Sequence, residues 1–106
     1  MNEDLPGLLR KGIRESGLRL KEAGFSLETF DSTERMDKKS FGIYVEKNGR
    51  GFYLTVWDSG EVQVSTIDYE VDPSPCERHL SDVLADQLRT EFEELVDWVS
   101  GSSGRI

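Results

Sequence analysis

The sequence predicts an α+β fold in which a four-stranded antiparallel β-meander lies between an N-terminal and a C-terminal helix, in the order α-β-β-β-β-α. Two turn sequences, Lys47-Asn48-Gly49-Arg50 and Asp58-Ser59-Gly60, separate runs in which apolar and polar residues alternate. Apolar residues also recur at three and four residue spacing near both ends of the chain. We expect one domain over residues 1–100 and a flexible tail at 101–106.

The first predicted helix covers residues 5–23. Asp4 can cap its start, and Gly24 marks its end. Its apolar positions at helical spacing are Leu5, Leu9, Ile13 and Leu20. Its opposite side carries five basic residues, Arg10, Lys11, Arg14, Arg19 and Lys21. We interpret these as a solvated or internally paired face, with a binding patch as the alternative.

Four strands follow, at about residues 25–30, 40–47, 51–57 and 61–69, with a loop at 31–39 between the first two. The Asn48-Gly49 pair suits a two-residue type I′ turn, which sets Val45 opposite Phe52. Val62 and Val64 reach the same apolar side only if the second turn is a three-residue loop closed by a left-handed Gly60. The register therefore places Tyr44, Tyr53 and Trp57 together on the other side of the sheet.

The second predicted helix follows a proline-containing segment. Pro73 and Pro75 are expected to end the sheet, because proline cannot donate a ladder hydrogen bond. Ser81 can cap the helix, and Gly101 follows its end; a break at Thr90 is an alternative. The apolar stripe of this helix is Leu84, Leu88, Phe92, Leu95 and Val99.

Composition limits the classes of function. The chain has 106 residues and a net charge of −8, and all of the excess negative charge falls between residues 58 and 97. This distribution argues against a nucleic-acid partner and suits attraction to a basic one, although an acidic solvated face that keeps a small protein soluble is the commoner explanation. No segment has the pattern of a membrane span or a secretory signal, so we expect no membrane partner and a cytoplasmic protein.

The sequence predicts no catalytic, cofactor-binding or metal-binding residues. Cys76 is the only cysteine and His79 the only histidine, which makes half of a zinc site without a second pair. Carboxylates are too abundant for any pair to stand out as an acid and base. We therefore expect a protein that binds rather than an enzyme, and no cofactor.

The best candidate site is a surface for a protein partner on the aromatic side of the sheet. Aromatic anchors inside an acidic rim provide buried area at the centre and electrostatic steering at the edge. The alternative is one helix on each side of the sheet, which would make these aromatics core. The candidate residues are Tyr44, Tyr53, Trp57, Asp58, Glu61, Ile67, Asp68 and Glu70, with Tyr69 as a further member.

The run Tyr53-Leu54-Thr55-Val56-Trp57-Asp58-Ser59-Gly60, followed by an alternating strand and an acidic amphipathic helix, resembles the bacterial immunity proteins of the TriTu type. The resemblance covers about residues 40–99. It implies a cytoplasmic inhibitor, active in interbacterial competition, whose partner is a toxin domain of the ADP-ribosyltransferase class that attacks elongation factor Tu. It supplies no catalytic residues.

The resulting hypothesis is a monomeric immunity protein that binds and occludes a cognate toxin with a basic surface. An immunity protein against another toxin class, such as a nuclease, is one alternative. A small acidic chaperone or adaptor for a secreted effector is another, and it would usually be a dimer. An enzyme would need carboxylates that converge in a pocket.

Overall fold

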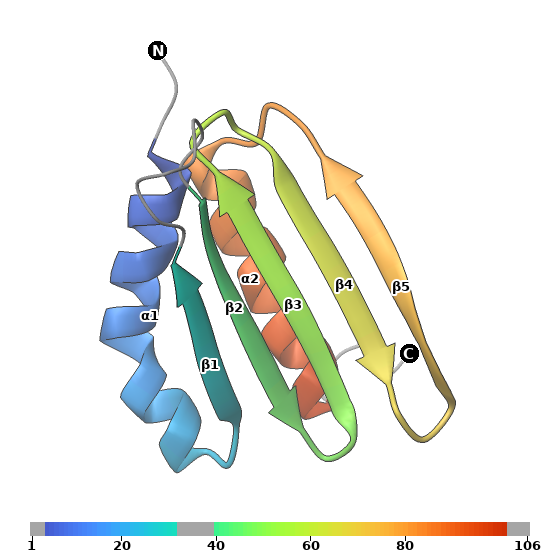
Figure 1. Ribbon diagram of the computed structural model, residues 1–106. Helices are drawn as coiled ribbons and strands as arrows, with labels where there is room; N and C mark the ends of the chain where they lie inside the picture. The colour runs from blue at the N-terminus through green and yellow to red at the C-terminus, as the bar shows by residue number, and fades with distance from the viewer. Residues whose placement is uncertain (1–3, 32–39, 102–106) are drawn as a thin grey trace.

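The computed structural model describes residues 4–31 and 40–101, which form a sheet layer and a helix layer (Figure 1). Five antiparallel strands lie in the order β1-β2-β3-β4-β5. The elements are α1 (Leu5–Glu22), β1 (Ser26–Asp31), β2 (Ser40–Lys47), β3 (Arg50–Trp57), β4 (Val62–Asp68), β5 (Asp72–Leu80) and α2 (Ala85–Ser100). The α+β class, the antiparallel sheet and the terminal helices are confirmed, but the sheet has five strands rather than four. Except for Asp31, the predicted loop lies outside the described residues, as does the tail beyond Gly101.

Both hairpin turns have the predicted geometry. Asn48 and Gly49 have φ angles of 56° and 85°, and Val45 pairs with Phe52 across the first hairpin. Gly60 has a φ of 95° and closes a three-residue loop, which sets Val62 opposite Val56. The left-handed backbone at Gly60 explains why glycine ends this turn, because a side chain is disfavoured there.

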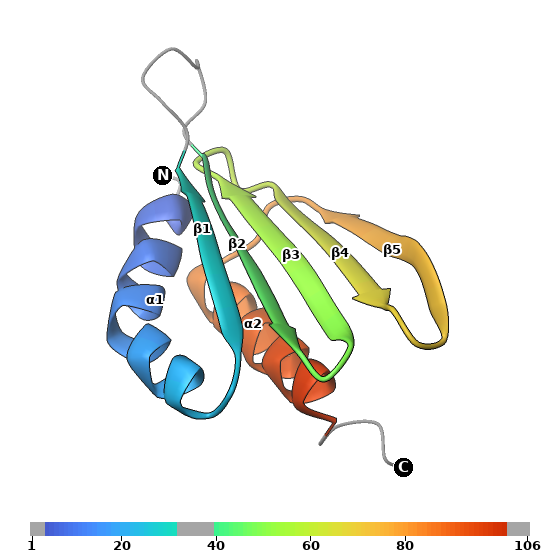
Figure 2. The ribbon, with the colours of Figure 1, turned by 60° about the horizontal axis from the view of Figure 1, so that its bottom comes forward.

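Both helices cover the same face of the sheet (Figures 1 and 2). The inward residues of β2, β3 and β4 are fully or almost fully buried, and they meet the apolar sides of α1 and α2. Phe52 of β3, for example, meets Phe92 of α2 edge to face with ring centroids 6.4 Å apart. The sheet part of this core consists of Phe41, Ile43, Val45, Phe52, Leu54, Val56, Val62 and Val64.

The prediction that Pro73 and Pro75 end the sheet was wrong. The chain turns back after β4, and β5 pairs with it from Asp72 to Leu80. Three residues of β5, 73–75, lie opposite Ile67 alone, where the register shifts between Thr66 and Asp68. Proline is tolerated at such a bulge and on an edge strand, because its missing N–H removes no ladder bond that is needed there.

The predicted start of the second helix was also wrong. Ser81 is not the cap; α2 begins after Leu84, whose N–H donates to the Gln87 side-chain oxygen at 2.8 Å. The residues before it are held by the sheet, since the N–H of buried Val83 donates to the Gly60 carbonyl at 3.0 Å. The helix then runs without a break past Thr90 and ends at left-handed Gly101.

The first helix follows its prediction closely. It spans Leu5–Glu22, and the Gly7 N–H donates to the Asp4 carboxylate at 3.1 Å. That bond satisfies one of the unpaired N–H groups at the helix start. Of the helices that the structure describes, neither has the length and apolarity to cross a membrane.

Candidate protein-binding face

The side of the sheet that faces away from the helices carries a group of large side chains, which we call the aromatic face: Phe30, Tyr44, Tyr53, Trp57, Ile67 and Tyr69. Three of them are strongly exposed, with 48% of Phe30, 42% of Tyr53 and 48% of Tyr69 accessible. The structure thus places the predicted aromatic residues on an uncovered surface. The alternative arrangement, in which these residues form core beneath a second helix, is wrong.

The aromatic rings contact one another across the strands. Tyr44 and Tyr53 are direct partners on β2 and β3, and their ring centroids lie 4.5 Å apart. Phe30 of β1 extends the group, with its ring centroid 6.2 Å from that of Tyr53. These contacts hold the rings in place before any partner arrives, which lowers the entropy lost on binding.

Gly51 gives Tyr44 its position. A Cβ atom at Gly51 would lie 2.6 Å from the Tyr44 hydroxyl oxygen, so the phenol occupies the space that any other residue would fill. The hydroxyl reaches across β3 at this point to Tyr69, which follows β4; the two oxygens are 2.9 Å apart. Gly51 is therefore needed for the close approach of a side chain.

The hydrogen bonds of Tyr44 have a defined direction. Its hydroxyl donates to the Glu46 carboxylate at 2.9 Å, and a carboxylate can only accept. With its single proton used, Tyr44 must accept the second bond from the Tyr69 hydroxyl. Burial, and then the bonds with Tyr69 and Glu46, raise the pKa of Tyr44 well above its ordinary value near 10. Tyr44 thus remains a neutral phenol at physiological pH.

The predicted acidic rim is only partly assembled. Asp58 and Glu61 lie at the turn between β3 and β4, while Glu70 lies at the opposite end of the sheet, against Gly49. Asp68 belongs to the helix side, where its carboxylate is 3.2 Å from the Arg50 guanidinium. Its placement in the rim was wrong, because alternate residues of a strand point to the same side and Asp68 follows buried Val62 and Val64 in that alternation.

Other acidic residues lie on the aromatic face and were not predicted there. Glu28 of β1 lies opposite Tyr44 of β2, and Glu46 of β2 accepts a hydrogen bond from the Tyr44 hydroxyl. Glu77 of β5 lies opposite Ser65 of β4. The alternation after Tyr44 already indicated Glu46. Glu28, Glu77 and the ring of Phe30 could not be found without the pairing of β1 and β5, which no turn sequence specifies.

The basic residues of the described strands all lie on the helix side of the sheet. Among the strand residues that the structure describes, no Lys or Arg lies on the aromatic face. Lys47, Arg50 and Arg78 all point to the helix layer, where they bond the Ala23 carbonyl, the Trp98 carbonyl and the Glu91 carboxylate. The charged strand residues that the structure describes on the aromatic face are therefore all acidic, which favours a basic partner.

The two residues with metal-binding chemistry do not converge. Cys76 pairs with Thr66 and His79 with Gln63, and these positions belong to opposite sides of the sheet. Within residues 4–31 and 40–101, no group of three or more His, Cys, Asp and Glu residues is placed to hold a metal ion. The Cys76 thiol and the His79 imidazole therefore do not lie on one side of the sheet, as two ligands of the same zinc ion would.

Comparisons with protein-family models, with curated proteins and with solved structures find no match for this chain. The resemblance to TriTu-type immunity proteins thus stays a prediction. What the structure adds is the aromatic face itself.

Proposed function

We propose that this protein is a stoichiometric inhibitor that binds a basic protein through its aromatic face. The observation that carries the proposal is the uncovered sheet surface with exposed Phe30 and Tyr53, flanked by carboxylates and without a strand Lys or Arg among the described residues. Large exposed aromatic side chains are typical anchors of protein interfaces. Binding, rather than catalysis, is the activity that this surface supports.

The chemistry of the face defines the partner. A Lys or Arg side chain from the partner can stack on the ring of Phe30 or Tyr53 while it pairs with Glu28 or Glu46. Tyr44, whose hydroxyl bonds both Glu46 and Tyr69, holds the Glu46 carboxylate in place beside the rings. A partner with basic residues around an apolar centre would satisfy all of these groups.

In its specific form, the proposal is immunity against an ADP-ribosyltransferase toxin domain, within the bacterial cytoplasm. The segment 53–60 resembles TriTu-type proteins, which supports this form of the proposal. Two residues of the segment, Tyr53 and Trp57, lie on the aromatic face. Occlusion of the toxin's nicotinamide-cofactor or substrate cleft would give inhibition without any catalytic group in this chain. The proposed complex contains one copy of each protein.

The proposal expects an ADP-ribosyltransferase toxin domain to be encoded next to this gene, and the experiment is a titration of that domain. Its ADP-ribosylation of elongation factor Tu is measured as the purified chain is added. The proposal predicts a linear loss of activity that is complete at a ratio of one to one. If the two proteins bind tightly while the toxin keeps its activity, the protein is a chaperone or adaptor rather than an inhibitor.

A further inference from the structure

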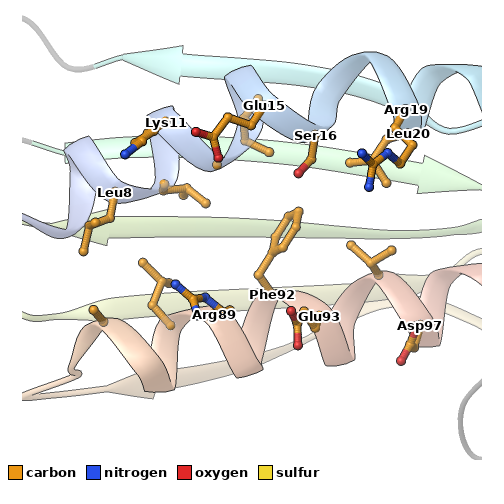
Figure 3. Close-up of a pocket in the computed structure, with 16 residues that line it drawn as sticks. Leu8, Lys11, Glu15, Ser16, Arg19, Leu20, Arg89, Phe92, Glu93 and Asp97 are labelled. Carbon is orange, nitrogen blue, oxygen red and sulfur yellow. The ribbon is translucent and has the colours of Figure 1, made fainter.

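The helix layer and the sheet layer differ in what they offer a basic partner. Between α1 and α2 lies an open groove of about 540 Å³, into which Phe92 projects (Figure 3). Basic and acidic side chains line this groove in equal number: Lys11, Arg19, Arg89, Glu15, Glu93 and Asp97. The groove therefore has no net charge to attract a basic protein. It also lies on the side of the sheet away from the aromatic face.

The turn between β4 and β5, residues 69–71, adjoins the aromatic face. Val71 is 81% exposed, more than any other large apolar residue that the structure describes. Tyr69 of the same turn is 48% exposed and belongs to the aromatic face. Figures 1 and 2 show the turn at a corner of the sheet, on the edge away from α1. An exposed apolar group thus continues the proposed interface to the end of the sheet.

Hydrogen bonds fix the backbone of this turn. The Tyr69 N–H donates to the Gly49 carbonyl in the neighbouring turn at 2.8 Å. The Asp68 carboxylate accepts from the N–H groups of Glu70 and Val71, at 3.2 and 3.3 Å. All three N–H groups of the turn are therefore bonded within the chain. A partner that binds the turn does not have to order its backbone, which lowers the entropy lost on binding.

Local structure does not explain the valine in this turn. Turns favour Gly, Pro, Asn, Asp and Ser, which either suit the backbone angles or bond the backbone, and a β-branched apolar side chain does neither. Val71 is also outside the buried core. Only another molecule can supply the apolar contacts that this side chain lacks.

Glu70 is the acidic group of the turn. Its side chain lies against Gly49, where a Cβ atom would be 3.2 Å from Oε2. Lys47 and Arg50, the two cations that flank Gly49, bond backbone carbonyls at the ends of the helices instead. Among the residues that the structure describes, the Glu70 carboxylate has no ion pair. It can therefore pair with a basic group of the partner.

We propose that the β4–β5 turn is the part of this protein that enters the catalytic cleft of the toxin, with Val71 in an apolar subsite and Glu70 against a Lys or Arg. This inference rests on the proposed function and adds the element that blocks the cleft. A turn at a corner of the sheet can bury the Val71 side chain on all sides only in a concave site. The aromatic face then covers the flatter surface beside the cleft.

The first experiment compares substitutions in the turn with matched substitutions on α1. The turn variant carries Val71→Ser and Glu70→Gln, and the control carries Leu18→Ser and Glu22→Gln. All four side chains are exposed and serine suits a turn, so both variants should keep the parent's melting temperature. Isothermal titration calorimetry with the toxin domain should give a Kd at least about tenfold higher for the turn variant and within about twofold of the parent for the control.

The second experiment measures the accessibility of position 71 directly. Cys76→Ser removes the only cysteine, which is exposed, so Val71→Cys or Leu18→Cys then introduces a single thiol. Its modification by N-ethylmaleimide is followed by mass spectrometry of the intact chain. An excess of toxin domain should slow the reaction at position 71 at least about tenfold and leave position 18 unchanged, because a buried interface excludes solvent.

Three results would overturn this inference and leave binding by the aromatic face intact. In the first, the turn variant binds the toxin domain as tightly as the parent does. In the second, the thiol at position 71 reacts as fast in the complex as in the free chain. In the third, position 71 is protected while the toxin keeps its activity, which places the turn outside the catalytic cleft. A parent chain that does not bind the toxin domain would instead contradict the proposed function, and this inference with it.

Discussion

The hydroxyl oxygens of Tyr44 and Tyr69 lie 2.9 Å apart on the aromatic face, joined across β3 above Gly51. The contact links β2 to the turn after β4, although the two strands are not neighbours in the sheet. It exists because Gly51 has no side chain. The position of Tyr44, and with it the centre of the proposed binding surface, therefore depends on this glycine.

Gly51→Ala should displace the Tyr44 ring and break its bonds to Glu46 and Tyr69. A methyl group there would lie 2.6 Å from the hydroxyl oxygen, so we expect the free energy of unfolding to fall by about 2 kcal/mol. Urea denaturation measures the change. The matched control is Gly12→Ala in α1, where a Cβ meets nothing within 4 Å and helix propensity should raise stability by about 0.5–1 kcal/mol. Equal effects from both substitutions would contradict the steric account.

Stability should decline in alkaline solution because of Tyr44. Its pKa is raised in the folded protein, so above about pH 10 the unfolded chain loses this proton while the folded chain retains it. The unfolded state then binds fewer protons, and the free energy of unfolding falls as pH rises. Urea titrations at pH 8, 10 and 11 should show a smaller decline for Tyr44→Phe than for the parent protein. Identical declines would show that Tyr44 does not contribute.

Arg50 should be the most important charged residue for stability. Its guanidinium lies 4.9 Å from the centre of the Trp98 ring, donates to the Trp98 carbonyl at 2.8 Å and pairs with Asp68. It thus attaches the last turn of α2 to the sheet, at a carbonyl that also accepts the Gly101 N–H at 3.1 Å. Arg50→Lys should reduce the free energy of unfolding by about 2 kcal/mol, because lysine lacks the planar fork and the stacking surface.

Thermal unfolding, followed by Trp fluorescence, measures this loss. Arg14→Lys on the exposed side of α1 is the control, and it should leave the transition unchanged. An unchanged melting temperature in Arg50→Lys would show that α2 is held by its apolar contacts alone.

The central hairpins could be predicted from the sequence because local chemistry specifies them. Asn48-Gly49 and Gly60 require particular backbone angles, and the apolar alternation then leaves one register for Tyr44, Tyr53 and Trp57. The first helix was predictable for the same reason, since its cap and its apolar spacing agree.

The fifth strand could not be predicted because its own sequence argues against a strand, although it forms a hairpin with β4. Pro73 and Pro75 argue against a strand in general, and only the edge position and the bulge opposite Ile67 make them acceptable. The start of α2 depends in turn on β5, whose pairing through Leu80 delays the helix beyond Ser81. The groove between the helices was also missed, because the spacing of α1 and α2 is set by packing on the sheet.

The most direct test of the proposed binding surface uses a variant of this protein with Phe30→Ala and Tyr53→Ala. It measures the affinity of that variant for the toxin domain that the proposal expects the adjacent gene to encode. Both side chains are about half exposed, so the melting temperature should stay close to that of the parent protein. Isothermal titration calorimetry should show binding at least about 100-fold weaker, or about 2.7 kcal/mol. The control Leu18→Ala, an exposed apolar residue on α1, should bind as the parent does. Unchanged affinity in the double variant would contradict the claim that the aromatic face binds the partner.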